Sequence, residues 1–205
     1  MQTLPIRPAA KTAILLPLLA LALASGCATP TQRLDLSHDT SPEVNALDSR
    51  DFDIAAEKMI GDMIASGAVD KPAGGRYVLA ISRVANRTKQ DIDVDQLVKK
   101  IRIALNRSGK VVVTTAVSAD GAEDDMSRAV RGLADDDMFN AATVARAGTA
   151  IAPELSLSGK IIERNLRISS SKQRIEYVFQ LTITDINTGL AFWEGEETIG
   201  KIGAR

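Results

Sequence analysis

The chain has 205 residues, a length that suggests one folded domain with additional segments at its ends. Hydrophobic residues make up 45% of it and charged residues 25%, which is typical of a globular protein and not of a disordered one. The net charge of −1 lacks the basic excess that a general nucleic-acid-binding protein needs to displace counterions from phosphates. With one cysteine and one histidine, the chain can form neither an internal disulfide nor a zinc centre of cysteine and histidine ligands.

Residues 1–26 are interpreted as a signal peptide that is cleaved from the mature protein. Arg7 and Lys11 give a positive start, and an apolar run follows over residues 12–24. That run is too short to cross a bilayer as a helix, which needs about 20 residues. The following Leu23-Ala24-Ser25-Gly26-Cys27 resembles a bacterial lipobox, although the leucine usually found three positions before the cysteine stands one position earlier here.

Cys27 is therefore the expected lipid attachment site, and an ordinary secretory signal with an incidental cysteine is the alternative. Ala28 follows it, and not the aspartate that commonly retains lipoproteins in the inner membrane. We expect the protein to be anchored in the outer membrane and to face the periplasm. Residues 27–49 show no sustained periodicity and are interpreted as a flexible tether, reaching at most about 75 Å. The only histidine, His38, lies in this tether and is discounted as a catalytic residue.

The globular domain is predicted over residues 50–205. It opens with a helix that Ser49 or Asp51 caps and Gly67 ends. Residues of one helical stripe form its apolar face: Phe52, Ala56, Met59, Ile60, Met63 and Ile64. The apolar run 77–81 then predicts a strand covered on both faces, followed by a loop at residues 86–88.

A second helix is predicted from Asp91 or Asp93 to Gly109, because apolar residues keep helical spacing between them. The run 110–117 predicts a second buried strand. Strand, helix and strand within about 40 residues predict a right-handed βαβ unit with parallel strands.

Residues 120–137 are rich in acids and are interpreted as a solvated helix with its loop. The adjacent carboxylates of Asp135, Asp136 and Asp137 suggest two roles. They can cap a further helix over residues 138–147, or they can bind a metal ion. The cap is the favoured interpretation, because adjacent carboxylates do not converge on one ion without further ligands.

The C-terminal third changes to the two-residue period of strands with one polar face. Alternation predicts strands over 154–161, 175–186 and 191–199, with a hairpin turn at 187–189. The predicted fold class is therefore α/β, with a parallel βαβ unit and a C-terminal antiparallel meander in one mixed sheet packed with helices.

The sequence offers little for catalysis. Residues 51–205 contain no histidine, no cysteine and no glycine-rich phosphate loop, so no Ser–His pair and no cofactor site are expected. A glycosidase with two acids is the enzyme class that stays open, because acids are abundant. We predict a protein that is not an enzyme and that needs neither cofactor nor metal.

A cationic hairpin is the most distinctive surface that the sequence predicts. Between residues 160 and 174 the only acid is Glu163, against five cations: Lys160, Arg164, Arg167, Lys172 and Arg174. The hairpin is either a solvated sheet edge, where cations discourage aggregation, or a surface that attracts an acidic partner. Trp193 has two interpretations as well, a core residue or a binding anchor, and the core is favoured.

Several segments in order along the chain resemble the LpoB family of outer-membrane lipoproteins. They cover roughly residues 51–200, and the most distinctive are Tyr177-Val178-Phe179-Gln180-Leu181-Thr182 and Thr188-Gly189-Leu190-Ala191-Phe192-Trp193-Glu194. The resemblance implies a fold like the N-terminal domain of TolB. It also implies a regulator that binds and stimulates a class A penicillin-binding protein, the bifunctional synthase that polymerises and crosslinks peptidoglycan.

Charge and strand placement predict the residues that contact the synthase: Arg164, Arg167, Lys172, Arg174 and Tyr177. The chain departs from the best-known members of the family in its tether, which is about half as long or less. The alternative is an envelope assembly or secretion lipoprotein related to the curli-export lipoprotein. That protein forms a pore with long membrane-spanning hairpins, and no such hairpin is evident in this sequence.

Overall fold

The computed structural model describes residues 33, 35, 40, 42–119 and 124–204. The chain divides into two units, Met1–Pro42 and Glu43–Arg205. The described helices and strands all belong to the second unit, which begins earlier than residue 50, where the sequence analysis placed the domain. No helix in the described ranges has the length and apolar character that a membrane span requires.

The parallel part of the sheet is a βαβ unit, as predicted. Strand β1 (Tyr77–Arg87) is followed by helix α3 (Asp95–Ser108) and by strand β2 (Val111–Val113), which pairs in parallel with the start of β1. Strand β1 continues to Arg87, so the loop predicted at residues 86–88 begins later, and a bulge interrupts its register after Ile81. Strand β2 is shorter than the predicted run 110–117.

The antiparallel part is a meander of three long strands, β3 (Leu155–Arg167), β4 (Lys172–Asp185) and β5 (Ala191–Ala204). Strand β3 also pairs in parallel with β1, so the sheet has the order β2-β1-β3-β4-β5. The predicted class, a mixed sheet that combines a βαβ unit with an antiparallel meander, is confirmed. All three strands are longer than the sequence predicted, because alternation fades where both faces are solvated.

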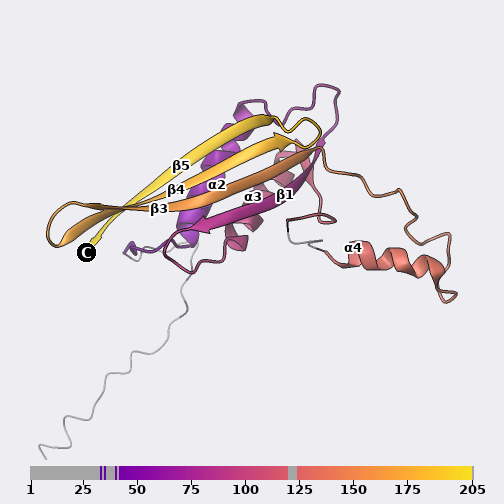
Figure 1. The fold of residues 1–205 in the computed structure, drawn as a ribbon, viewed down its shortest axis with the longest axis horizontal. Coiled ribbons are helices and arrows are strands. Elements are labelled where there is room, and N and C mark those ends of the chain that lie inside the picture. The colour runs from indigo at the N-terminus through magenta and orange to yellow at the C-terminus, as the bar shows by residue number, and fades with distance from the viewer. Residues whose placement is uncertain (1–32, 34, 36–39, 41, 120–123, 205) are drawn as a thin grey trace, which may run out of the picture. The chain divides into compact units, whose positions relative to one another are not determined.

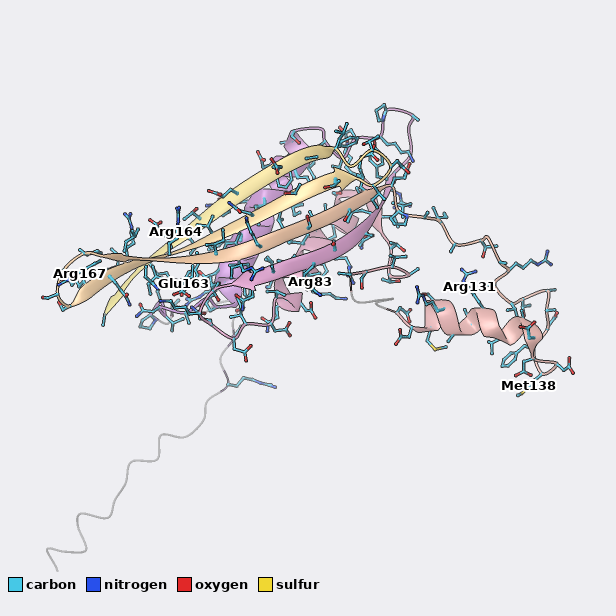
Figure 2. All side chains as sticks on the ribbon, viewed as in Figure 1. Arg83, Arg131, Met138, Glu163, Arg164 and Arg167 are labelled. Atoms are coloured by element: carbon cyan, nitrogen blue, oxygen red, sulfur yellow. The ribbon has the colours of Figure 1, made fainter. Side chains whose placement is uncertain are left out.

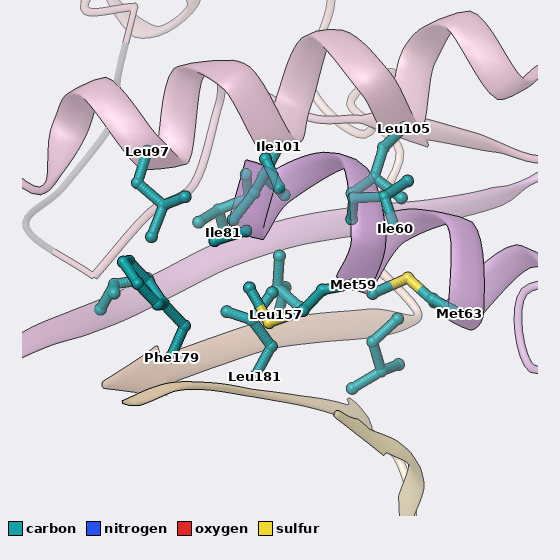
Figure 3. Close-up of a cluster of buried hydrophobic side chains, with 14 of the residues drawn as sticks. Met59, Ile60, Met63, Ile81, Leu97, Ile101, Leu105, Leu157, Phe179 and Leu181 are labelled. Carbon is teal, nitrogen blue, oxygen red and sulfur yellow. The ribbon is translucent and has the colours of Figure 1, made fainter. Parts of the chain in front are cut away.

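Helices α2 (Ser49–Ala65) and α3 cover one face of the sheet (Figure 1). Figure 3 shows their aliphatic side chains against the inward residues of the strands: Met59, Ile60, Met63, Leu97, Ile101 and Leu105 against Ile81, Leu157, Phe179 and Leu181. Aliphatic residues fill most of this core, as the low aromatic content of 3% requires. Each fully buried side chain of this kind contributes roughly 1.5–3 kcal/mol.

The opposite face of the sheet is polar along β3, β4 and β5, as the alternation predicted. Register pairs Ser158 with Thr182, and Thr182 with Glu194, one step away from the core residues Leu157 and Ile183. No described helix packs on this face. In β1 the consecutive residues Leu79, Ala80 and Ile81 are all buried, so this part of the strand is shielded on both faces, as the apolar run predicted.

Neither predicted residue is the N-cap of helix α2, because the cap lies one residue before Ser49 and three before Asp51. Asp48 is the N-cap residue, and its Oδ1 accepts hydrogen bonds from the backbone N–H of Arg50 (2.8 Å) and of Asp51 (3.3 Å). Asp51 completes a capping box, because its carboxylate accepts from the Asp48 N–H at 2.8 Å. The predicted acid is thus part of the cap, but at its third helical position.

The helix predicted over residues 138–147 is absent. Short helical turns occur earlier instead, α4 (Met126–Ala129) and the 3-10 helix η2 (Val130–Asp135). Side-chain turns then compete with helix formation, because Asp136 Oδ1 accepts from the Met138 N–H (2.9 Å) and Asn140 Oδ1 from the Ala142 N–H (3.0 Å). No core stabilises a helix there, since Met138 is 80% exposed.

Candidate partner-binding surface

The hairpin of β3 and β4 carries the predicted cations. In its register Arg164 lies opposite Glu176, Leu166 opposite Arg174, and Arg167 opposite Gln173. Opposite residues of an antiparallel pair share a face, and faces alternate along each strand. Arg164 and Arg174 therefore lie on the polar outer face of the sheet, and Arg167 lies on the other face.

Lys172 belongs to the outer face as well, since it lies two residues before Arg174 in the same strand. The structure thus brings three of the four predicted cations together, and Figure 2 shows Arg164 and Arg167 in the part of the hairpin nearest its turn. The guanidinium of Arg167 instead donates to the Ser169 carbonyl at 3.2 Å, within the turn.

One acid lies among these cations. Arg174 Nη2 lies 3.0 Å from Glu176 Oε1, and Glu176 is also the residue opposite Arg164. An exposed ion pair of this kind contributes at most about 1 kcal/mol. The three outer-face cations against one carboxylate leave this end of the hairpin with a positive excess.

Exposed aliphatic side chains accompany the cations, and the sequence analysis did not single them out. Leu166 is directly opposite Arg174 on β4, and Ile202 of β5 is opposite Arg174 on the other side. Ile202 is 68% exposed, and Ile168 in the turn is 53% exposed. The alternation of β5 beyond residue 199 was the signal that could have placed Ile202 here. We call Arg164, Leu166, Lys172, Arg174 and Ile202 the hairpin surface.

Tyr177 does not belong to the hairpin surface. It is 1% exposed and faces the core, so it cannot contact a partner, and its place among the predicted contact residues is withdrawn. Its hydroxyl donates to the Asn45 carbonyl at 2.8 Å and accepts a hydrogen bond from Gln90 Nε2. Burial, with the nearby carboxylate of Glu163, raises the pKa of the Tyr177 phenol above its usual value.

Tyr177 is one of several residues that fix residues 43–48, which we call the N-terminal strap. Gln90 Oε1 accepts from the Leu47 N–H (3.0 Å), and Lys201 Nζ donates to the Ala46 carbonyl (2.8 Å). The Leu47 side chain is buried in the core. The strap also lies close against β5, where any side chain at Gly203 would overlap the amide of Asn45.

A buried ion pair adjoins the strap. Lys201 Nζ of β5 lies 2.6 Å from Asp51 Oδ2 of α2, and both side chains are almost fully buried. Because Asp51 is part of the capping box, the pair connects the start of the first helix to the last strand. Neither residue stood out in the sequence, since an isolated charge gives no sign of its partner.

Of the remaining candidates, Trp193 and the three adjacent aspartates lie within the described residues, and Cys27 and His38 do not. Trp193 is buried, and its Nε1 donates to Asp62 Oδ2 at 3.1 Å, which confirms the interpretation as a core residue. Within the described ranges, which include Asp135 to Asp137, no three metal-ligating side chains come together.

These features define a two-layer α/β domain whose exposed hairpin combines positive charge with aliphatic side chains. The family model described as "Peptidoglycan-synthase activator LpoB" matches residues 51–199. That match spans well over half of the chain, which therefore belongs to the LpoB family. The family is regulatory and not catalytic, and the synthesis that it activates takes place in the cell envelope.

Solved structures include similar domains at low identity. The C-terminal domain of LpoB from Escherichia coli is 19% identical, and the match covers 74% of this chain and 99% of that one with a TM-score of 0.46. The corresponding domain from Salmonella enterica is 16% identical, with coverage of 73% and 98% and a TM-score of 0.43. A comparison with curated protein sequences finds no match. The family match carries the assignment.

Proposed function

We propose that the mature protein is an outer-membrane lipoprotein that binds a bifunctional class A penicillin-binding protein and stimulates its glycan polymerisation and peptide crosslinking. In this proposal acylated Cys27 is the membrane anchor, residues 28–42 form the tether, and the globular unit faces the periplasm. The protein regulates the synthase and catalyses no step itself. The single observation that carries the proposal is the family match over residues 51–199.

The hairpin surface is the proposed contact with the synthase. Its cations attract an acidic patch and accelerate the encounter, while Leu166 and Ile202 supply apolar area that water leaves on binding. Arg167, on the other face, adds to the positive field but is not required to touch the same patch. Tyr177 supports this surface only from below, because it belongs to the core.

The test is a polymerisation assay with the cognate synthase and lipid-linked disaccharide. Residues 28–205 are added in soluble form, and the rate of glycan-chain formation is measured. We expect this rate to rise with the concentration of the added protein and then to reach a plateau. Changing Arg164, Lys172 and Arg174 together to Glu should raise the concentration needed for half-maximal stimulation at least roughly tenfold. The reason is that attraction to an acidic patch becomes repulsion at three positions.

The matched control changes Arg76, Arg107 and Arg128 to Glu, an equal change in charge at exposed positions away from the hairpin. Equal losses in both triple variants would move the contact elsewhere and leave the function standing. No stimulation by the unmodified protein, together with no complex in co-sedimentation, would overturn the proposed function. A large ring-shaped oligomer in the same sedimentation run would favour the alternative secretion role.

A further inference from the structure

A groove runs along the second half of β1 and ends at Arg87, which pairs with Ile162, two residues before Arg164 of the hairpin surface. Seven consecutive residues of β1, Ile81–Arg87, line it, and residues of the first half of α3 line the side across from them. Its volume is about 1170 Å³. At about 3.3 Å per strand residue, the β1 wall is roughly 20 Å long, which suits an extended segment better than a compact ligand.

The groove lies along the edge of β1 that pairs with β2, beyond the point where β2 ends. Strand β2 pairs with β1 only at residues 77–79, whereas β3 pairs with β1 as far as Arg87. Ser118 and Ala119, which follow β2 in the chain, line the groove at that side. The short β2 thus leaves room between β1 and α3 where a longer strand would have continued.

The lining is cationic although the chain as a whole is not. Five lining side chains are basic, Arg83, Arg87, Lys99, Lys100 and Arg102, and two are acidic, Asp93 and Asp95. Lys100 also forms an ion pair with Asp53 of α2, and Asp95 offsets part of the charge of Arg102. Counting Asp53 with the acids still leaves a positive excess, in a chain whose net charge is −1.

We propose that this groove is a second binding site, which takes an extended acidic segment of a partner protein. The side chains of an extended segment along β1 alternate between the side of α3 and the outer side of the sheet. Acids on the side of α3 would meet Lys99 and Lys100, while the residues between them would lie beside the half-buried Ala85. A second copy of this chain fits less well, because pairing two β1 edges would bring Arg83 and Arg87 of both copies together. The proposal is independent of the proposed function, since it uses other residues.

The test uses residues 28–205 labelled with ¹⁵N and the peptide acetyl-Ser-Asp-Val-Asp-Ile-Asp-Val-Asp-Ser-amide as probe. We expect progressive shifts of the amide signals of Ile81–Arg87 and of the first half of α3 on titration. The peptide with Lys in place of each Asp should cause none. Lys99→Glu should weaken the affinity roughly tenfold, whereas Arg107→Glu, the same change on the same helix outside the groove, should not.

Five outcomes would overturn the proposal, four of them in the titrations and one in a competition experiment. The first four are no shifts along the groove at millimolar peptide, equal binding of the lysine peptide, equal effects of Lys99→Glu and Arg107→Glu, and shifts that follow protein concentration without peptide, which would indicate a second copy. Tripolyphosphate that competes as strongly as the peptide would reduce the site to a general anion site and would also overturn it. The variant with Glu at Lys172 and Arg174 only, which lie farther from Arg87 than Arg164 does, should bind the peptide normally, so this test can fail or succeed apart from the synthase assay.

Discussion

Among the predicted site residues, Tyr177 differs most between prediction and structure, because it was predicted to contact a partner and is instead a core residue. It sits in a strand beside a cationic segment, which favoured a surface position, yet the register places it on the core face beside Phe179 and Ile175. The parity of the strand decides this. Tyr177 belongs to the same alternate set as the apolar residues Phe179, Leu181 and Ile183, so the alternation itself indicated the core. The hydroxyl group then fixes the strap, a contact between residues 132 positions apart.

Replacing Tyr177 by Phe should remove part of the loss of folding stability that the protein shows at alkaline pH. The raised pKa of the phenol means that the unfolded chain ionises first, so Tyr177 stabilises the fold fully below the usual tyrosine pKa near 10. That contribution is lost as the pH rises from there through the raised folded pKa. Denaturant unfolding followed by circular dichroism should show a steeper loss of stability above pH 10 for the unmodified protein than for Tyr177→Phe.

Near neutral pH the same variant should be destabilised by about 1–2 kcal/mol, because the Asn45 carbonyl loses its donor. The control is Tyr77→Phe, at the start of β1, where the side chain is only half-buried. Parallel pH profiles for Tyr177→Phe and the unmodified protein would contradict the assignment of the alkaline loss to this phenol.

At the scale of elements, the ion pair of Lys201 with Asp51 carries a sharper prediction. Lys201→Met should cost about 3–5 kcal/mol in the free energy of unfolding, because it leaves a buried carboxylate without its cation. The measurement is urea unfolding at neutral pH. Adding Asp51→Asn should restore part of the loss, since the amide oxygen still completes the capping box while the uncompensated charge disappears.

Lys58 provides the comparison for this variant. It also pairs with β5, through Glu197 at 2.6 Å, but its side chain is 60% exposed. Lys58→Met should therefore cost less than about 1 kcal/mol. Similar losses in the free energy of unfolding for Lys58→Met and Lys201→Met would show that burial does not determine how much the Lys201 pair contributes to stability.

The elements themselves were predictable where a core imposes a period. Helical spacing located α2 and α3, and alternation located the three strands of the meander, because each buries one face. Their ends were less predictable: the cap of α2 depends on which of four nearby polar residues, Asp48 to Asp51, turns its side chain back. The prediction of a helix over residues 138–147 was wrong because this segment packs against no core, so no burial favours a helix there.

The candidate site was predictable in its charge and not in its geometry. A dense run of cations from Arg164 to Arg174 is visible without a structure, and three of the four predicted cations do share a face. Their aliphatic neighbour Ile202 comes from a strand 28 residues later than Arg174, and only register brings them together. The groove beside β1 could not have been predicted, because it depends on how early β2 ends.

For the whole molecule, the strap sets where the domain can be shortened. A protein starting at residue 50 lacks the Asp48 cap, the buried Leu47 side chain and the backbone partners of Tyr177, Gln90 and Lys201. It should be at least about 2 kcal/mol less stable than a protein starting at residue 43. Thermal unfolding of the two forms measures the difference, and forms starting at 28 and 43 should melt alike.

Equal melting temperatures for the forms that start at 43 and at 50 would show that the strap adds no stability. In that event the globular unit would begin near Arg50, where the sequence analysis placed it. The same experiment on the Tyr177→Phe background should show a smaller effect of deleting the strap, since one of its attachments is already absent.

The strap also has a mechanical consequence. Under the proposed lipid anchoring, every pull that the envelope exerts on the domain enters the fold at Glu43. The first contacts to bear it are the ion pairs of Glu43 with Arg50 (3.7 Å) and Lys201 (3.6 Å). The hydrogen bonds of Asn45, Ala46 and Leu47 with Tyr177, Lys201 and Gln90 follow. Two of these partners belong to the paired strands β4 and β5, so tension is divided between neighbouring strands before it reaches the capping box of α2. The load therefore enters at the end of the sheet that carries the hairpin surface, where the strap braces the two strands from their core side.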